Sequence, residues 1–185
     1  TNYELCGPEQ APVAMLSHSL ASGMSMWDSQ LTALQSRFRI LRYDTRGHGG
    51  SDVPDGPYRL DDLVADAVAL MDALAIRQVH IVGLSMGGMI AQIVAARFGE
   101  RTRTLAVIFS SNNQALLPPP APEQLRALLQ RPADATREAV IANAIRVARI
   151  IGSPGYPVPE ERLRTDAIEA YERAWACDPT SAFGG

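Results

Sequence analysis

The sequence lacks lysine entirely, has only two cysteines, and contains few aromatic residues. All 17 basic residues are arginine, scattered along the chain, and 20 acidic residues bring the formal net charge to −3. Because no basic run is present, we expect no nucleic-acid partner. No apolar run reaches the ~18 residues that a membrane-spanning helix needs, so we expect no membrane insertion.

Cys6 and Cys177 lie far apart and form no metal-ligand spacing, so we expect no metal, and the serine chemistry described below implies no other cofactor. Two free thiols favour a cytoplasmic protein, and a disulfide between them is the open alternative. The 185 residues, 46% hydrophobic and 20% charged, suffice for one soluble globular domain with a substantial core. The chain begins without methionine in what reads as the middle of a strand, which suggests a missing N-terminal segment.

The first part of the chain alternates short apolar runs with segments of helical periodicity. This alternation is typical of a mostly parallel α/β sheet flanked by helices. We predict strands at residues 13–17, 38–43, 79–82 and 105–109, and helices at 27–34, 60–74 and 85–97.

After Ser111 the pattern changes to a proline-rich stretch followed by helical periodicity alone. Helices are predicted at 123–130, 135–149 and 159–176, with a break at 152–157 where glycine and proline gather. We therefore predict two domains, an α/β core over 1–111 and a helical lid over 112–185.

Residues 83–87, GLSMG, fit the pattern G-x-S-x-G, in which a serine lies on a tight turn between a strand and a helix. A strand is predicted before Ser85 and a helix after it, as this turn requires. The start of a helix stabilises negative charge, and the backbone N–H of Met86 is well placed to donate to an oxyanion. We therefore predict a catalytic Ser85. The alternative is a glycine-flanked turn with an inert serine.

The loop after the strand at 13–17, with the sequence SHSLASGMSMW from Ser17, is a second candidate element. Folds with this serine turn take another oxyanion N–H from the loop at this position. We predict that Leu20 supplies that N–H, with His18 and Ser19 shaping the loop. The alternative is a plain loop with a hydrogen-bonded histidine.

Asp44, Arg46 and His48 follow the strand at 38–43 and could form a catalytic cluster. We favour a glycine-rich turn stabilised by an internal ion pair. His80 lies within a predicted strand, where a hydrogen-bonded structural histidine is expected.

These segments together resemble the α/β-hydrolase family over about residues 3 to 111. SHSLASGMSMWDSQL, FRILRYDTRGHGGSDVPDGPY and HIVGLSMGGMIAQ are similar to 3-oxoadipate enol-lactonases and neighbouring small esterases. In the predicted lid, IGSPGYPVPEERLR is similar to a broader set of esterases that includes polyketide methylesterases. Ser19 stands where most family members carry glycine, and the enol-lactonase group tolerates serine there.

The resemblance implies a catalytic triad in the chain order serine, acid, histidine. All three histidines precede Ser85, and no residue matches the family's catalytic acid. Asp134, Asp166 and Asp178 lie in lid-like sequence and are interpreted as solvated helix surface rather than as the catalytic acid. Arg146 and Arg149, at i and i+3, are interpreted in the same way, and the alternative is that they hold a substrate carboxylate.

We therefore expect the acid, the histidine and the last strands of the sheet in a C-terminal part that this chain does not contain. Without those strands, the apolar strand at 105–109 is an open sheet edge, which proteins rarely leave unpaired. A second polypeptide that completes the sheet, or a homo-oligomer, is the alternative.

The sequence thus predicts a serine hydrolase of small carboxylic esters or lactones that acts through an acyl-enzyme on Ser85. Ser19 and Trp27 are candidate substrate-binding residues, although a tryptophan with Met24 and Met26 beside it is also typical of a core. The first alternative is a hydrolase of other chemistry, namely acyl transfer, C–C hydrolysis or perhydrolysis. The second is a truncated, non-catalytic binding module.

Overall fold

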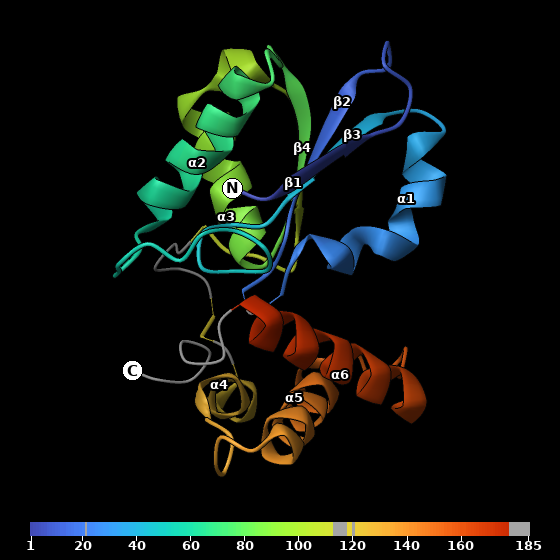
Figure 1. Cartoon of the computed structure of the whole chain (residues 1–185), viewed down its shortest axis with the longest axis vertical. Coiled ribbons are helices and arrows are strands. Elements are labelled where there is room, and N and C mark those ends of the chain that lie inside the picture. The colour runs from blue at the N-terminus through green and yellow to red at the C-terminus, as the bar shows by residue number, and fades with distance from the viewer. Residues whose placement is uncertain (21, 113–117, 120, 178–185) are drawn as a thin grey trace. The chain divides into compact units, whose positions relative to one another are not determined.

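The computed structural model describes residues 1–20, 22–112, 118–119 and 121–177, with the backbone alone for 173–177. The chain divides into two compact units, which we call the sheet unit (Thr1–Gln114) and the helical unit (Ala115–Gly185). Figure 1 shows the two units, coloured from the N-terminus in blue to the C-terminus in red. Each unit is described by itself, and the role of the helical unit as a lid stays a prediction.

The described part of the sheet unit contains one five-stranded sheet in the order β1-β3-β2-β4-β5. Its strands are β1 (Tyr3–Cys6), β2 (Val13–Ser17), β3 (Arg39–Tyr43), β4 (Val79–Leu84) and β5 (Thr102–Ile108). Strand β1 pairs antiparallel with β3, and every other pairing is parallel. The α/β fold predicted from the sequence is confirmed.

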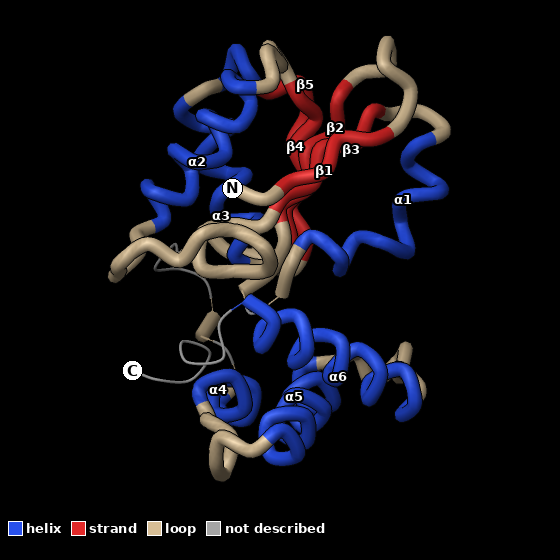
Figure 2. The backbone as a smooth tube through the Cα atoms, in the orientation of Figure 1, coloured by secondary structure: helices blue, strands red, loops and turns tan. Residues whose placement is uncertain are grey.

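Helices cover both faces of this sheet. Helices α2 (Leu60–Ala73) and α3 (Met86–Arg97) lie on one face, and the 3-10 turn η1 (Met24–Trp27) leads into α1 (Asp28–Gln35) on the other (Figures 1 and 2). Helix α2 begins where the sequence predicts, because Asp62 accepts the free N–H of Arg59 at 2.8 Å and Asp61 and Asp62 favour the positive end of the helix dipole.

The two faces of the sheet form separate cores, because successive side chains of a strand point in opposite directions. Along β2, Met15 packs into the cluster under α2 and α3, whereas Ala14 and Leu16 pack into the cluster under α1. The first cluster includes the predicted apolar stripe of α2, namely Leu63, Val64, Ala67, Leu70 and Met71, together with Ile90, Ala91 and Val94 of α3.

The strand ends differ in part from the prediction. Strand β4 continues to Leu84, and a short 3-10 turn, η2 (Gly99–Arg101), leads into β5, which begins at Thr102 rather than at Leu105. The sequence did not suggest this earlier start because Arg103 and Thr104 are polar. They are tolerated because β5 lies at the edge of the described sheet, where its side chains are largely exposed.

The parallel strands end at the same level. Ser17 of β2 is level with Tyr43 of β3 and Gly83 of β4, and Leu84 is level with Ile108 of β5. The loops that follow β2, β3 and β4 therefore meet along one edge, which is where α/β sheets bind ligands.

In its described residues, the helical unit contains α4 (Pro122–Leu129), α5 (Arg137–Ile151) and α6 (Glu160–Cys177). Ile141 and Ile145 of α5 pack against Ala167 of α6. Ion pairs from Arg137 to Glu172 and from Arg149 to Glu160 join the same two helices. The predicted break at 152–157 lies between them, as expected.

Candidate active site

Ser85 lies on a strained turn at the end of β4. Its φ of 54° and ψ of −117° are a backbone conformation that a residue with a side chain rarely adopts. The strain is supported by hydrogen bonds on both sides. The Ser85 N–H donates to the carbonyl of Ile108 at 3.0 Å, and the Ser85 carbonyl accepts the Ser110 hydroxyl at 2.7 Å.

Helix α3 begins directly after this serine. As its first residue, Met86 carries one of the backbone N–H groups that have no acceptor within the helix. The side chain of Ser85 is half-buried. The strand, turn and helix predicted around Ser85 are therefore all present.

The loop after β2 lies against the first turn of α3. A Cβ on Gly87 would lie 2.2 Å from the carbonyl oxygen of Ser17 and 2.6 Å from that of His18, so only glycine permits this approach. Leu20, the predicted second oxyanion donor, belongs to the same loop and is 65% exposed. Its role as a donor stays a prediction.

His18 is completely buried and has a defined tautomer. Its Nε2 accepts the backbone N–H of Thr45 at 2.9 Å, so the proton lies on Nδ1, which donates to the Ser19 carbonyl at 2.7 Å. Burial lowers the pKa of His18 below its usual value, which favours the neutral ring. With both nitrogens engaged, His18 shapes the loop and is not available as a base.

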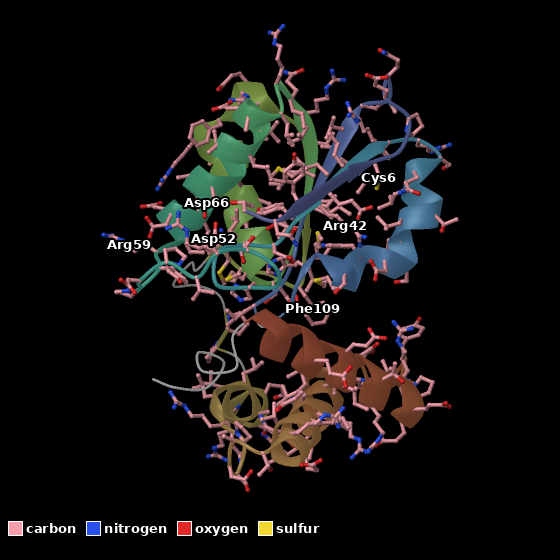
Figure 3. All side chains as sticks on the ribbon, viewed as in Figure 1. Cys6, Arg42, Asp52, Arg59, Asp66 and Phe109 are labelled. Atoms are coloured by element: carbon pink, nitrogen blue, oxygen red, sulfur yellow. The ribbon has the colours of Figure 1, made fainter. Side chains whose placement is uncertain are left out.

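The turn after β3 differs from its prediction. Arg46 forms a bidentate ion pair with Asp66 of α2, with both N–O contacts at 2.6 Å. It does not pair with Asp44 of its own turn. Figure 3 shows Asp66 on the α2 side of the sheet. Asp44 instead accepts the N–H groups of Met24 and Gly50 and the side-chain amide of Asn2. The expected internal ion pair is therefore wrong, because packing brings α2 over this turn.

The two remaining histidines have structural partners. His48 Nδ1 lies 3.1 Å from the Arg46 carbonyl, and the centroid of its ring lies 5.2 Å from that of His18, with the two rings tilted by 55°. His80 contacts the Thr104 hydroxyl at 2.8 Å, and at the rise of a strand it lies about 16 Å before Ser85 along β4. Within the described residues, no histidine hydrogen-bonds to the Ser85 hydroxyl.

The candidate substrate-binding residues have unequal surroundings. Ser19 is half-buried, and its hydroxyl lies 3.2 Å from that of Ser22. Trp27 is 6% exposed and packs with Ala14, Leu16 and Ile40, although its Nε1–H finds no acceptor among the described residues. Contact of either residue with a substrate stays a prediction.

The charged residues of the helical unit have local partners. Arg149 pairs with Glu160, Arg146 donates to Asn143 at 2.9 Å, and Asp166 pairs with Arg162 at 2.8 Å. Asp134 accepts the N–H of Thr136. Asp178 lies outside the described residues.

The site contains two groups that the sequence did not single out, the buried Tyr43 and the half-buried Ser110. The Tyr43 hydroxyl lies 3.0 Å from that of Ser17 directly below the loop, and burial raises the pKa of Tyr43 to about 12. Ser110 supports the Ser85 turn from the residues after β5. Both lie just at or past a strand end, the one positional signal that could have indicated them.

A cavity of about 530 Å³ lies at the opposite edge of the sheet, lined by residues 10–13, 75–78 and 103. It includes none of the candidate site residues. Across the described ranges, no cluster of three or more histidine, cysteine, aspartate or glutamate side chains could hold a metal ion. No helix in this part of the chain is long and apolar enough to cross a membrane.

Comparison with known families adds to this geometry. The model of the alpha/beta hydrolase fold matches residues 12–153, which is more than half of the chain. The chain belongs to the alpha/beta hydrolase family. The resemblance read from the three sequence segments is therefore confirmed.

Among curated relatives, 3-oxoadipate enol-lactonase 2 of Acinetobacter baylyi is 40% identical over 130 residues, which cover 70% of this chain and 48% of the relative. Rhodomycin D methylesterase of Streptomyces peucetius is 29% identical, with 92% of this chain and 65% of the relative covered. The chain thus spans about half the length of the first of these alpha/beta hydrolases.

Two solved structures are also similar. The enol-lactonase from Burkholderia xenovorans LB400 has a TM-score of 0.67 at 32% identity, covering 96% of this chain and 67% of that one. A meta-cleavage product hydrolase from Pseudomonas fluorescens IP01 has a TM-score of 0.73 at 27% identity, covering 91% and 59%.

Proposed function

We propose that this alpha/beta hydrolase chain carries the nucleophile and the oxyanion-binding groups of a serine hydrolase that cleaves carboxylic esters or lactones. The observation that carries the proposal is the strained Ser85 between β4 and α3, with the loop after β2 packed on the first turn of that helix. A hydroxyl on such a turn projects from the sheet edge, next to backbone N–H groups that have no acceptor in the helix.

In the proposed reaction, the Ser85 oxygen attacks the substrate carbonyl and its proton passes to a histidine base. The N–H groups of Met86 and Leu20 stabilise the resulting oxyanion, at about 3 kcal/mol for each donor. The histidine then protonates the departing alkoxide or enolate oxygen. Water attacks the acyl-enzyme and passes a proton to the histidine, which gives it to the departing Ser85 oxygen as the carboxylic acid is released.

We propose that this histidine and the acid that orients it come from a segment outside the 185 residues. The hydrogen bonds of His18 to Thr45 and Ser19, and the distance of His80 from Ser85 along β4, support this part of the proposal. Strand β5 supports it as well. Its apolar residues Leu105, Val107 and Ile108 are about 40% exposed. Such exposure is expected of an edge strand beside which a further strand would pack.

The substrate class rests on the relatives. An enol-lactonase and a methylesterase are both named for the hydrolysis of a carboxylic ester bond, cyclic in the first and open in the second. Ser19 supports a lactone as the substrate, because it stands where most family members carry glycine and the enol-lactonase group tolerates serine. Trp27, whose Nε1–H has no acceptor among the described residues, is a candidate donor to a polar group of the substrate.

Two other functions have an observation in their favour. The similarity to a meta-cleavage product hydrolase, at a TM-score of 0.73, favours C–C hydrolysis by the same serine. The engaged histidines favour a binding module without catalysis, should no base be supplied from elsewhere.

Product analysis separates these functions. The complete protein is incubated with an aryl ester, an enol-lactone and a vinylogous diketone, alongside its Ser85→Ala variant. Hydrolysis of the ester or lactone that the variant loses supports the proposal. Cleavage of the diketone alone indicates C–C hydrolysis, and equal rates for the two proteins exclude a catalytic Ser85.

A further inference from the structure

Asp44, directly after β3, is 3% exposed and joins three separate segments of the sheet unit. Its Oδ1 accepts the backbone N–H of Met24 at 2.7 Å. Its Oδ2 accepts the backbone N–H of Gly50 at 2.9 Å and the side-chain amide of Asn2 at 2.7 Å. A buried carboxylate needs such donors to compensate for its lost hydration, and here they are amides.

The backbone is shaped to admit this carboxylate. Gly49 has a φ of +52°, and a Cβ at this position would lie 2.3 Å from the carboxyl carbon of Asp44. The turn after β3 therefore closes around the side chain. Of the three donors, the Met24 N–H lies at the end of the loop after β2, which carries the proposed oxyanion donor Leu20.

The same loop is attached to the same turn at its start. The Thr45 N–H donates to Nε2 of His18, and Nδ1–H of His18 donates to the Ser19 carbonyl. Ser22 donates its hydroxyl to that carbonyl as well, at 2.9 Å. Adjacent residues of the turn, Asp44 and Thr45, thus hydrogen-bond to the two ends of the loop.

These bonds determine the direction of the proposed donor. The peptide between Ser19 and Leu20 is trans, so the Ser19 carbonyl and the Leu20 N–H point in opposite directions. Because His18 and Ser22 hold the carbonyl on one side, the Leu20 N–H must face the other. Releasing the loop at Met24 would displace the nearby Ser22 hydroxyl, so that His18 alone would hold this peptide and its orientation would be less fixed.

We propose that Asp44 is a positioning residue of the hydrolase, which orients the Leu20 N–H through the backbone of Met24. This inference rests on the proposed function. Asp44 does not touch the substrate. Its contribution lies in the transition state, where a donor displaced by about 1 Å loses most of its effect.

The test compares Asp44→Asn with Asp66→Asn in the complete protein. An asparagine keeps one acceptor oxygen. The side that faces Gly50 and Asn2 offers two donors and the other side only the Met24 N–H, so the oxygen stays with the pair and the NH₂ group faces Met24, where the bond is lost. Asp66 is a matched control, because its carboxylate contacts the same turn through Arg46 and has no bond to the loop.

Asp44→Asn is expected to lower kcat roughly 10- to 100-fold with KM changed less than about twofold. Amide hydrogen exchange at Met24 should accelerate in parallel. Asp66→Asn is expected to keep kcat within about twofold even where its melting temperature falls equally. Equal losses of kcat in both variants, or faster exchange at Met24 with unchanged kcat, would overturn the inference.

A second pair of variants, with smaller changes, tests the inference if Asp44→Asn fails to fold. Ser22→Ala removes one of the two donors to the Ser19 carbonyl, and we expect kcat to fall roughly threefold to tenfold. Ser25→Ala, in the adjacent 3-10 turn, should leave it unchanged. No difference between the two variants contradicts the inference. Ser85→Ala, measured alongside, separates this outcome from failure of the proposed function, because full activity in that variant refutes the serine mechanism itself.

Discussion

The backbone N–H of Thr45 donates to Nε2 of His18 across 2.9 Å, joining the turn after β3 to the loop after β2. This bond requires an unprotonated Nε2, because a protonated nitrogen cannot accept. The geometry of the candidate oxyanion loop is therefore linked to the protonation of one buried histidine. Its surroundings include the His48 ring at 5.2 Å and the carboxylate of Asp44.

The first prediction concerns pH. Burial lowers the pKa of His18 from its usual 6.5. Between the folded pKa and 6.5, His18 is therefore protonated in the unfolded chain but neutral in the folded chain. Stability from this group is complete above pH 6.5 and is lost as pH falls toward and through the lower folded pKa. The free energy of unfolding should decline by at most about 1.4 kcal/mol per pH unit on its account. Urea denaturation of wild type and His18→Gln between pH 8 and pH 5 should show a smaller decline in the variant. Equal declines would contradict the assignment.

A second prediction concerns the contact between α3 and the loop. Gly87→Ala places a methyl group 2.2 Å from the Ser17 carbonyl oxygen, so either the helix or the loop must move. We expect the free energy of unfolding to fall by about 2 to 3 kcal/mol. Gly99→Ala is the control, because a Cβ there meets nothing within 4 Å, and its effect should stay within about 0.5 kcal/mol. Similar values for both variants would show that the contact is loose.

A third prediction concerns Arg42, whose guanidinium is 11% exposed and pairs with Glu4 of β1 and Asp28 of α1. Figure 3 shows it on the α1 side of the sheet. Arg42→Met leaves two carboxylates without their cation, and we expect a loss of about 2 kcal/mol, below the value for fully buried pairs because both carboxylates are partly solvated. Arg97→Met breaks an exposed pair with Asp61 and should cost less than about 0.5 kcal/mol. Guanidinium denaturation distinguishes the two, and a cost for Arg42→Met as small as that for Arg97→Met would contradict a stabilising role for the buried Arg42.

The sequence predicted those parts of the fold that depend on local pattern. The apolar runs predicted strands β2 and β3, and the spacing of apolar residues predicted the buried face of α2. Side chains return to the same face every two residues in a strand and about every 3.6 residues in a helix. The Ser85 turn was predictable as well, since its glycines and flanking elements are all local in sequence.

The parts that failed depend on contacts between distant segments. The partner of Arg46 is Asp66, twenty residues away, and proximity in the sequence wrongly favoured Asp44. The role of Asp44 was invisible for the same reason, since its donors Asn2, Met24 and Gly50 come together only in the folded sheet unit. The early start of β5 was missed because an edge strand accepts polar residues such as Arg103. Phe109, labelled in Figure 3 and 86% exposed, was placed inside that strand and lies just beyond it.

The central claim is that Ser85 is a nucleophile, and a fluorophosphonate probe tests it most directly. The intact mass of the complete protein is measured before and after exposure, with Ser85→Ala and Ser110→Ala as matched variants, and the adduct is located by peptide mapping. We predict one adduct on Ser85, present in Ser110→Ala and absent from Ser85→Ala. An unmodified wild-type protein, or an adduct on another residue, would contradict the account.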